Sequence, residues 1–495
     1  MNSKLITAVL ILSATFEPAA HLQAAEDKAT FTKCMNMAEQ TALQMPPGRE
    51  KDVTLEQVIF AYSQAGVVEP IIALDNEIVD HHGQIQALLR ALRHADAPTD
   101  GDKAADAMLL RRALALVPTD PEAWSRDNLL WQIAGAFTDI GQVDAARDAT
   151  KLIESLDDYD HALYQIAAAQ AHHHDLAGAN ATAESIRPGS WREEAFAVIA
   201  EHATHDGDTS SADDALAQSR RHSDFALSPM ASEKSKAHDF RAALALARQI
   251  VNSGIQDGAM QRVGEDAAAA GALDFARDTF REAEANARQR QEGFGLADIA
   301  IAQAKANLFD DAMATVDDLE KLPIQHRRVM NGNDLVFALE NIAKEQARRG
   351  RQVDARHTLD RARPNLLGGA DSASIARDAV AIGEVAWARD VANGLQGLAR
   401  FRALQWIAAG LAKREDYDGA AATVVDIEHL QNRNDDYADE ARQYIAVEQI
   451  RHGRGVDAFE TASQIQGPVT QVFALTEMGA AAVGRCMTMS AAFCD

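Results

Sequence analysis

The 495-residue chain is poor in cysteine and in aromatic residues, and both shortages argue against classes of protein. Three cysteines cannot build the dense disulfide framework of a small secreted scaffold, and none stands at zinc-binding spacing. Aromatic residues make up only 5% of the chain, which is a poor supply for stacking against sugars. The composition therefore does not favour a disulfide scaffold, a zinc domain or a sugar-stacking protein.

Catalytic sequence motifs are also missing. The chain has no P-loop, no glycine-rich dinucleotide turn, no nucleophile elbow and no HExxH pattern. The acidic pairs Asp157-Asp158, Asp213-Asp214 and Asp435-Asp436 stand at expected turns or helix starts, where carboxylates cap backbone N–H groups. The sequence accordingly predicts no enzymatic activity and no cofactor.

Positive charge is in deficit, since the formal net charge is −26. Residues 1–25 carry one Lys and one Glu, so their removal would leave this charge unchanged. Such acidity keeps a long chain soluble and argues against nucleic acid as the general partner. Apolar residues still make up 47%, which is ample for a continuous core.

Long apolar runs are scarce. Leu5–Phe16 is apolar but too short to span a membrane as a helix, and no later stretch is long and apolar enough to do so. Lys4 precedes this run, and the small residues Ala20, Ala24 and Ala25 follow it. The arrangement predicts a signal peptide over residues 1–25 and a periplasmic or secreted protein, with a buried N-terminal helix as the alternative.

What the chain does contain is one pattern repeated ten times, beginning in Ile133–Ala149. An aliphatic residue and a small residue precede a turn residue by eight and seven positions, and an alanine follows the turn by five. The turn residues are Gly141, His174, Gly207, His238, Gly271, Asn307, Gly350, Gly383, Glu415 and Gly453. Successive turns are 31 to 43 residues apart, and a period in this range marks a solenoid or an array.

The pattern has a direct physical interpretation as a helical hairpin. A large apolar residue usually stands three positions before the aliphatic one, which gives an apolar stripe at helical spacing. The small residue lets two helix axes approach closely, and Gly, Asn or His suits a helix end that needs a left-handed residue, with Gly the least strained. Because one hairpin cannot bury both of its faces, neighbouring hairpins must stack.

On these residues the chain resembles the tetratricopeptide repeat family, whose repeats of about 34 residues carry a small residue in the first helix and an Ala in the second. The resemblance covers residues 58–466, although the family's Trp and Tyr positions are mostly Leu or Ala here and its closing Pro is mostly absent. It implies an all-α, right-handed α-solenoid of about twelve stacked helix-turn-helix repeats. It also implies a concave surface that binds a protein or peptide.

The repeat pattern divides the chain without any linker rich in Ser, Gly or Pro, which favours one elongated domain. After the signal peptide we expect an irregular leader over 26–50 and degenerate repeats over 51–126, with turns at Gly66 and near Gly101. Regular repeats should follow over 127–468, with longer loops at 321–333 and 431–436. Residues 469–495 should form a capping helix and a tail.

A row of cations marks a candidate ligand surface, despite the acidic whole. Two positions before the turn stand Lys305, Arg348, Lys413 and Arg451, and six before it stand Lys344 and Arg377. The resemblance implies that the first of these positions faces the concave groove, where such a row could bind an acidic or extended peptide. Capping of the helix dipole explains the four residues nearest the turns equally well, but not the other two.

Histidines and cysteines offer two weaker hypotheses. His172 and His205 share one repeat position, and His202 lies one helical turn before His205, so the three could form a zinc or copper site. A solvated, polar helix end is the plainer interpretation. Cys486 and Cys494 could close a terminal disulfide in an oxidising compartment, or remain free thiols.

Two classes of function remain open after these observations. The first is an exported, non-enzymatic scaffold that binds a protein or peptide of unknown identity on the concave face. The second is a cell-envelope polymer-acting enzyme on a helical scaffold, or else a His-rich metal-binding protein. The absence of a separate catalytic domain favours the scaffold, although fold-level analogy alone is weak support for a function.

Overall fold

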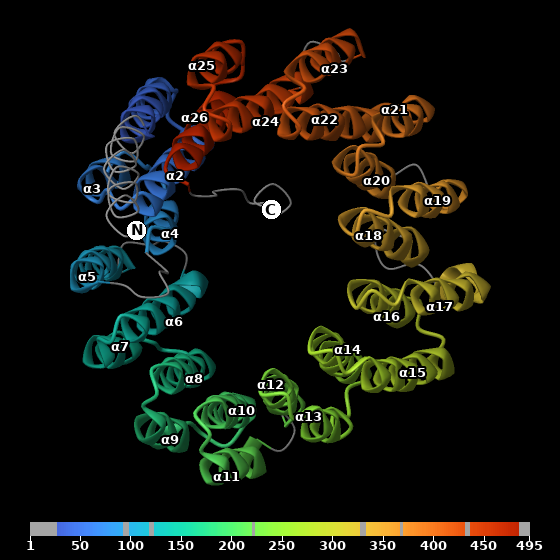
Figure 1. Cartoon of the computed structure of the whole chain (residues 1–495). Helices are drawn as coiled ribbons and strands as arrows, with labels where there is room; N and C mark the ends of the chain where they lie inside the picture. The colour runs from blue at the N-terminus through green and yellow to red at the C-terminus, as the bar shows by residue number, and fades with distance from the viewer. Residues whose placement is uncertain are drawn as a thin grey trace, which may run out of the picture. The chain divides into compact units, whose positions relative to one another are not determined.

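The computed structural model describes residues 27–92, 99–117, 123–219, 223–326, 333–366, 370–430 and 436–484. These residues form α-helices joined by short turns and 3-10 segments, and none of them lies in a strand (Figure 1). The all-α prediction is therefore confirmed. The predicted signal peptide, Cys486 and Cys494 lie outside the described residues. No helix among the described residues is long and apolar enough to cross a membrane.

The chain divides into two compact units, residues 122–407 and residues 1–121 with 408–495. The helices of the first unit are α6 (Ala123–Asp139), α7 (Val143–Thr150), α8 (Leu156–His172), α9 (Leu176–Ser185), α10 (Ser190–His205), α11 (Thr209–Ser219), α12 (Ser223–Lys236), α13 (Phe240–Ala247), α14 (Ser253–Ala269), α15 (Leu273–Arg290), α16 (Gly293–Lys305), α17 (Phe309–Lys321), α18 (Asp334–Arg348), α19 (Gln352–Ala362), α20 (Ala370–Ala381), α21 (Val385–Gly394) and the start of α22 (Gly397–Lys413). The second unit holds the end of α22 and also α2 (Arg49–Gln64), α3 (Glu69–Asp75), α4 (His81–Arg90), α5 (Asp100–Leu116), α23 (Tyr417–Leu430), α24 (Tyr437–Arg451), α25 (Gly455–Ser463) and α26 (Pro468–Ala482).

The predicted hairpin turns are confirmed. Each of the ten turn residues has a positive φ, including the non-glycine residues His174, His238, Asn307 and Glu415, whose φ values are 62 or 63°. These residues end one helix in the left-handed conformation and allow the next to begin two residues later. Gly66, with φ 80°, joins α2 and α3 in the same way. Gly101, in contrast, lies inside α5, after its N-cap Thr99.

The hairpins stack in two layers within residues 122–407. From α6 to α20, the even-numbered helices, which are the first of each hairpin, pack against one another in order, and the odd-numbered helices pack behind them (Figure 1). The aliphatic, small and alanine positions of the repeat pattern are all buried. Gly264 shows why one of them must be small, because a Cβ atom there would lie 2.5 Å from the Phe280 ring. The sequence pattern thus marks the contact between the two helices of a hairpin.

A recurring hydrogen bond also joins the two helices of four hairpins. A threonine hydroxyl in the second helix donates to the Oε1 atom of a glutamine twelve residues earlier in the first. The pairs are Thr182–Gln170 at 2.7 Å and Thr315–Gln303, Thr358–Gln346 and Thr461–Gln449 at 2.8 Å. Because these polar groups are largely withdrawn from water and need a partner, the bond selects one alignment of the two helices.

Aspartates near the start of several first helices hold the connection to the next hairpin. Asp127 accepts hydrogen bonds from the backbone N–H groups of Glu154 and Ser155, 27 and 28 residues ahead. Asp52, Asp224 and Asp439 each accept the same pair of bonds from the residues 27 and 28 positions ahead. These carboxylates satisfy backbone donors at the junction between repeats. The recurrence at Asp52 shows that α2 and α3 form a true repeat.

The expected irregular leader over 26–50 is wrong, because residues 27–44 form a helix. Its buried side chains are Phe31, Cys34, Met35, Ala38 and Ala42, which follow one another at helical spacing. They cover α26, since a Cβ atom added to Gly479 would lie 3.3–3.5 Å from atoms of Cys34, Met35 and Phe31. Burial raises the pKa of the Cys34 thiol to about 12, so this cysteine is packed as an apolar residue.

Helix α26 forms as predicted for residues 469–495, but it does not end the stack as a solvent-facing cap. It packs between α24 and α2, and helix 27–44 lies against it. Leu475, Met478 and Gly479 repeat the large, aliphatic and small pattern of a first helix, 33 residues after Ile445-Ala446. Helix 27–44 therefore serves as the second helix of this last hairpin. The hairpin is assembled from the two ends of the chain.

Candidate functional site

One stripe of each first helix remains open to solvent. On α18 the side chains at Phe337, Asn341, Lys344 and Arg348 are exposed or half-buried, while the positions between them are mostly buried. In repeat terms these residues stand thirteen, nine, six and two positions before the turn. The two positions of the predicted cationic stripe therefore share one face of this helix. In Figure 1 this layer lies on the inner side of the curve formed by residues 122–407.

An aromatic cluster crosses this face on three consecutive first helices. We define it as Trp131 of α6, His161 and Tyr164 of α8, and Trp191 of α10. The His161 ring lies between two indoles, 4.2 Å from the Trp131 centroid and 4.1 Å from that of Trp191, and it is nearly parallel to the latter. Tyr164 lies 5.6 Å from Trp191. All four side chains are half-buried, so the cluster keeps part of its ring surface open to solvent.

Carboxylates surround the aromatic cluster. The Trp191 indole N–H donates to Asp157 Oδ1 at 3.2 Å. Burial raises the pKa of Tyr164, and the negative charges of Glu194 and Glu201 raise it further. Burial lowers the pKa of His161, against the opposing effect of Asp158 and Asp157, so the ring is favoured in its neutral form. The cluster therefore combines aromatic surface with negative potential.

The predicted cationic stripe is largely neutralised by the chain itself. Lys305 Nζ lies 3.4 Å from Glu265, Arg348 lies 2.7 Å from Glu345 and Arg451 lies 2.5 Å from Glu448. Lys413 is exposed in the last turn of α22. A partner would have to compete with the carboxylates of the paired residues, so the stripe offers less free positive charge than the sequence predicts.

The remaining stripe residues, Lys344 and Arg377, meet in a mostly buried charge network between α18 and α20. Lys344 Nζ lies 2.7 Å from Asp378 Oδ2, and Arg377 Nε lies 2.7 Å from Asp378 Oδ1. Glu340 is farther from both cations, at 3.9 and 3.6 Å, and its Oε2 atom accepts a hydrogen bond from the Ser374 hydroxyl at 3.1 Å. The Arg377 guanidinium also lies 5.2 Å from the Trp406 ring centroid. These residues link neighbouring hairpins.

The two carboxyls of this network have opposite titration behaviour. Burial raises the pKa of Glu340 well above its usual range, and the adjacent Asp378 charge adds to the effect. Burial opposes ionisation of Asp378 as well, but the hydrogen bonds from Glu340 and Arg377, together with Lys344, lower its pKa to about 2. Because two touching carboxylates repel, the protein favours the protonated form of Glu340 and the ionised form of Asp378.

The three-histidine metal hypothesis is not supported. His172 lies edge-on to His202, with ring centroids 5.5 Å apart, whereas His205 lies beside His174 and both bind Asp206. Burial and the neighbouring His172 lower the pKa of His202. No group of three or more His, Cys, Asp or Glu side chains within the described ranges is placed to hold a metal ion. The stacked hairpins thus place His172 beside His202 and His205 beside His174, whereas the shared repeat position had suggested that His172 and His205 are neighbours.

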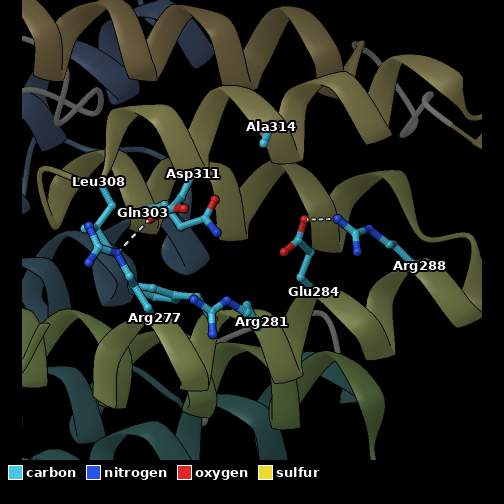
Figure 2. Close-up of a pocket in the computed structure, with 9 residues that line it drawn as sticks. Arg277, Arg281, Glu284, Arg288, Gln303, Leu308, Asp311 and Ala314 are labelled. Atoms are coloured by element: carbon cyan, nitrogen blue, oxygen red, sulfur yellow. Dashed lines mark hydrogen bonds and ion pairs between the residues drawn. The ribbon is translucent and has the colours of Figure 1, made fainter. Parts of the chain in front are cut away.

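A cavity of about 230 Å³ lies among α15, α16 and α17 (Figure 2). Three of its lining residues, Arg277, Arg281 and Arg288, come from α15. Arg277 pairs with Asp311 at 3.1 Å, Arg281 pairs with Asp278 at 2.7 Å, and Arg288 pairs with both Glu284 and Asp318. The arginines are thus held by carboxylates of the same chain, and the cavity has no clear preference for an anion or a cation.

Comparison with known proteins adds no family assignment. No family model matches the chain, and no curated protein matches it. Among solved structures it is similar to Ton1535 from Thermococcus onnurineus NA1, at 16% identity over 79% of this chain and 99% of that chain, with a TM-score of 0.26. It is also similar to the pentatricopeptide repeat protein PPR10 from maize, at 10% identity, 85% and 69% coverage and a TM-score of 0.25. A circular tandem repeat protein matches at 9% identity, 93% and 98% coverage and a TM-score of 0.13.

The hairpin turns, the buried small positions and the two-layer stacking define the class of this protein. It is an all-α helical repeat protein with an α-solenoid arrangement of its hairpins.

Proposed function

We propose that this protein is a non-enzymatic scaffold that binds a segment of another protein along the solvent-facing stripe of its first helices. The aromatic cluster carries the proposal, because it places half-exposed rings from three successive hairpins on one surface. Aromatic side chains bury a large area on contact and are enriched among the residues that dominate binding energy. A surface repeated along several hairpins suits an extended partner better than a small molecule.

Site-specific photo-crosslinking tests this proposal. A photoreactive residue is placed at Ala168 on α8 or Phe337 on α18, both on the first-helix stripe, in the natively expressed protein. Matched controls carry it at the exposed residues Leu273 on α15 and Val353 on α19, which belong to second helices. We expect the same discrete adduct from both stripe positions and no adduct from the controls. Adducts from the second-helix positions alone would contradict the proposal.

We further propose that the protein acts outside the cytoplasm, in the periplasm or the medium. The support is the sequence of residues 1–25, in which Lys4, a short apolar run and small residues follow one another as in a signal peptide. N-terminal sequencing of the natively expressed protein should find a chain that begins after Ala20, Ala24 or Ala25. A purified protein that retains Met1–Ala20 would show that export by this route does not occur.

A further inference from the structure

We propose that the aromatic cluster of Trp131, His161, Tyr164 and Trp191 binds cationic side chains, arginine or lysine, of an extended partner segment. This inference rests on the proposed scaffold function and specifies the chemistry of the partner. The ring surfaces and the surrounding carboxylates are the two independent observations that support it.

The ring geometry provides the first observation. Trp131 and Trp191 cover the two faces of His161, while Tyr164 lies beside Trp191 at a tilt of 31°. The three rings Trp131, His161 and Trp191 are each thirty residues from the next, so they form a continuous stack across three hairpins. An indole face attracts a cation through its quadrupole, and Trp is the strongest such partner among the aromatic residues. The outer faces and edges of the stack are where a guanidinium or an ammonium would lie.

The charge around the cluster provides the second observation. Helix α8, which carries His161 and Tyr164, contains no Lys or Arg but has Asp157 and Asp158, while its third carboxylate, Asp160, is paired with Arg187 at 2.7 Å. Glu194 and Glu201 of α10 act electrostatically on Tyr164. These carboxylates favour a cation beside the aromatic rings and disfavour an anion.

The local cations do not reverse this preference. Arg126 of α6 is paired with Glu154 at 3.3 Å, and the Arg192 guanidinium lies 5.8 Å from the Phe196 ring on its own helix. His161 adds no fixed positive charge, since burial lowers its pKa. The site therefore differs from the cationic stripe near α18 and α20, which the sequence matched to an acidic segment. The two surfaces predict partners of opposite charge, and this makes the inference testable.

The test uses the full-length protein and two synthetic twelve-residue peptides, one alternating Gly and Arg and the other alternating Gly and Glu. Binding is measured by titration calorimetry at low and high salt. Trp191→Leu removes one wall of the stack, and Trp406→Leu on α22 is the matched control on another first helix. A second variant, Glu194→Gln with Glu201→Gln, keeps the rings and removes charge. Urea unfolding confirms that each variant is folded.

The Arg peptide should bind, with an affinity that falls as salt rises. We expect Trp191→Leu and the double Gln variant each to weaken binding about tenfold, in line with one cation–π contact or a close charge. Trp406→Leu should leave the affinity unchanged. Stronger binding of the Glu peptide, equal weakening by Trp406→Leu, or no binding of the Arg peptide would overturn the inference. None of these three outcomes would contradict the proposed scaffold function, because the crosslinking experiment that tests it does not depend on the charge of the partner.

Discussion

Deletion of residues 27–44 should abolish cooperative unfolding of the unit formed by residues 1–121 and 408–495. The deleted helix buries Phe31, Cys34 and Met35 against α26, and its loss leaves the apolar face of a first helix open to water. A hairpin in such a stack is stable only when both of its helices are present. Amide hydrogen exchange on α26 and α2 should become fast, and a synthetic peptide of residues 27–46 should restore protection.

Single substitutions test whether the side-chain contacts between helix 27–44 and α26 stabilise the protein. Phe31 is 6% exposed and meets Tyr62 edge-on at 6.3 Å, so Phe31→Ala should cost about 3–5 kcal/mol in the free energy of unfolding. Gly479→Leu should cost about 1–3 kcal/mol through overpacking against Cys34. Leu43→Ala, at an exposed position of the same helix, should change stability by less than about 0.5 kcal/mol. Unchanged protection of α26 in the deletion variant would show that the two chain ends do not form a hairpin.

This closing hairpin also shows where sequence analysis stops. The hairpin register was readable because each turn residue lies a fixed number of positions from buried residues in the same hairpin. It placed even His238 and Glu415 correctly among the turn residues, and both have a positive φ. The apolar stripe of residues 31–42 was present in the sequence as well, but no turn joins it to α26. Its partner lies at the other end of the chain, so local spacing could not reveal the contact.

The aromatic cluster was missed for a different geometric reason. Its members stand at different repeat positions, ten, thirteen and sixteen residues before their turns for Trp131, His161 and Trp191. Each ring lies one helical turn earlier than the last, so the stack runs diagonally across the three helices. Alignment on the turn residues separates these rings, whereas a search for aromatic residues thirty positions apart would have aligned them.

The charged residues were predicted only in part. Lys344 and Arg377 are half-buried and share the repeat position six residues before the turn. Their partners could not be predicted, because Glu340 and Asp378 occupy different repeat positions and meet only when α18 packs on α20. Whether the cationic stripe binds a ligand stays a prediction. Simultaneous charge reversal at Arg348, Arg377 and Lys413 would address it, with the complication that Arg377 also holds the network together.

Replacement by the corresponding amide should cost much more stability at Asp378 than at Glu340. Asp378→Asn should destabilise the protein by about 3–5 kcal/mol, because it leaves Lys344 and Arg377 without their closest carboxylate in a mostly buried place. Glu340→Gln should cost less than Asp378→Asn, since burial favours the protonated form of Glu340 and glutamine has nearly the same shape. Urea unfolding of both variants, monitored by far-UV circular dichroism, measures the difference in their free energies of unfolding.

The pH dependence of stability provides an independent check on this assignment. The pKa of Glu340 is raised in the folded protein, so its contribution is fully present below the unfolded value of 4.5 and is lost as pH rises through the folded pKa. The pKa of Asp378 is lowered to about 2, so its contribution is present above 3.8 and is lost as pH falls toward 2. Glu340→Gln should therefore flatten the decline of stability above pH 4.5, while the loss at low pH remains.

An exposed ion pair of the same unit serves as the control. Arg351 and Asp354 lie 2.6 Å apart, but their side chains are 43% and 44% exposed. Asp354→Asn should change the free energy of unfolding by no more than about 1 kcal/mol, because water replaces the lost partner. If Asp378→Asn proves as mild as this control, the network is solvated and the proton assignment fails. If Glu340→Gln is as costly as Asp378→Asn, both carboxyls are ionised in the folded protein and each neutralises one of the two cations.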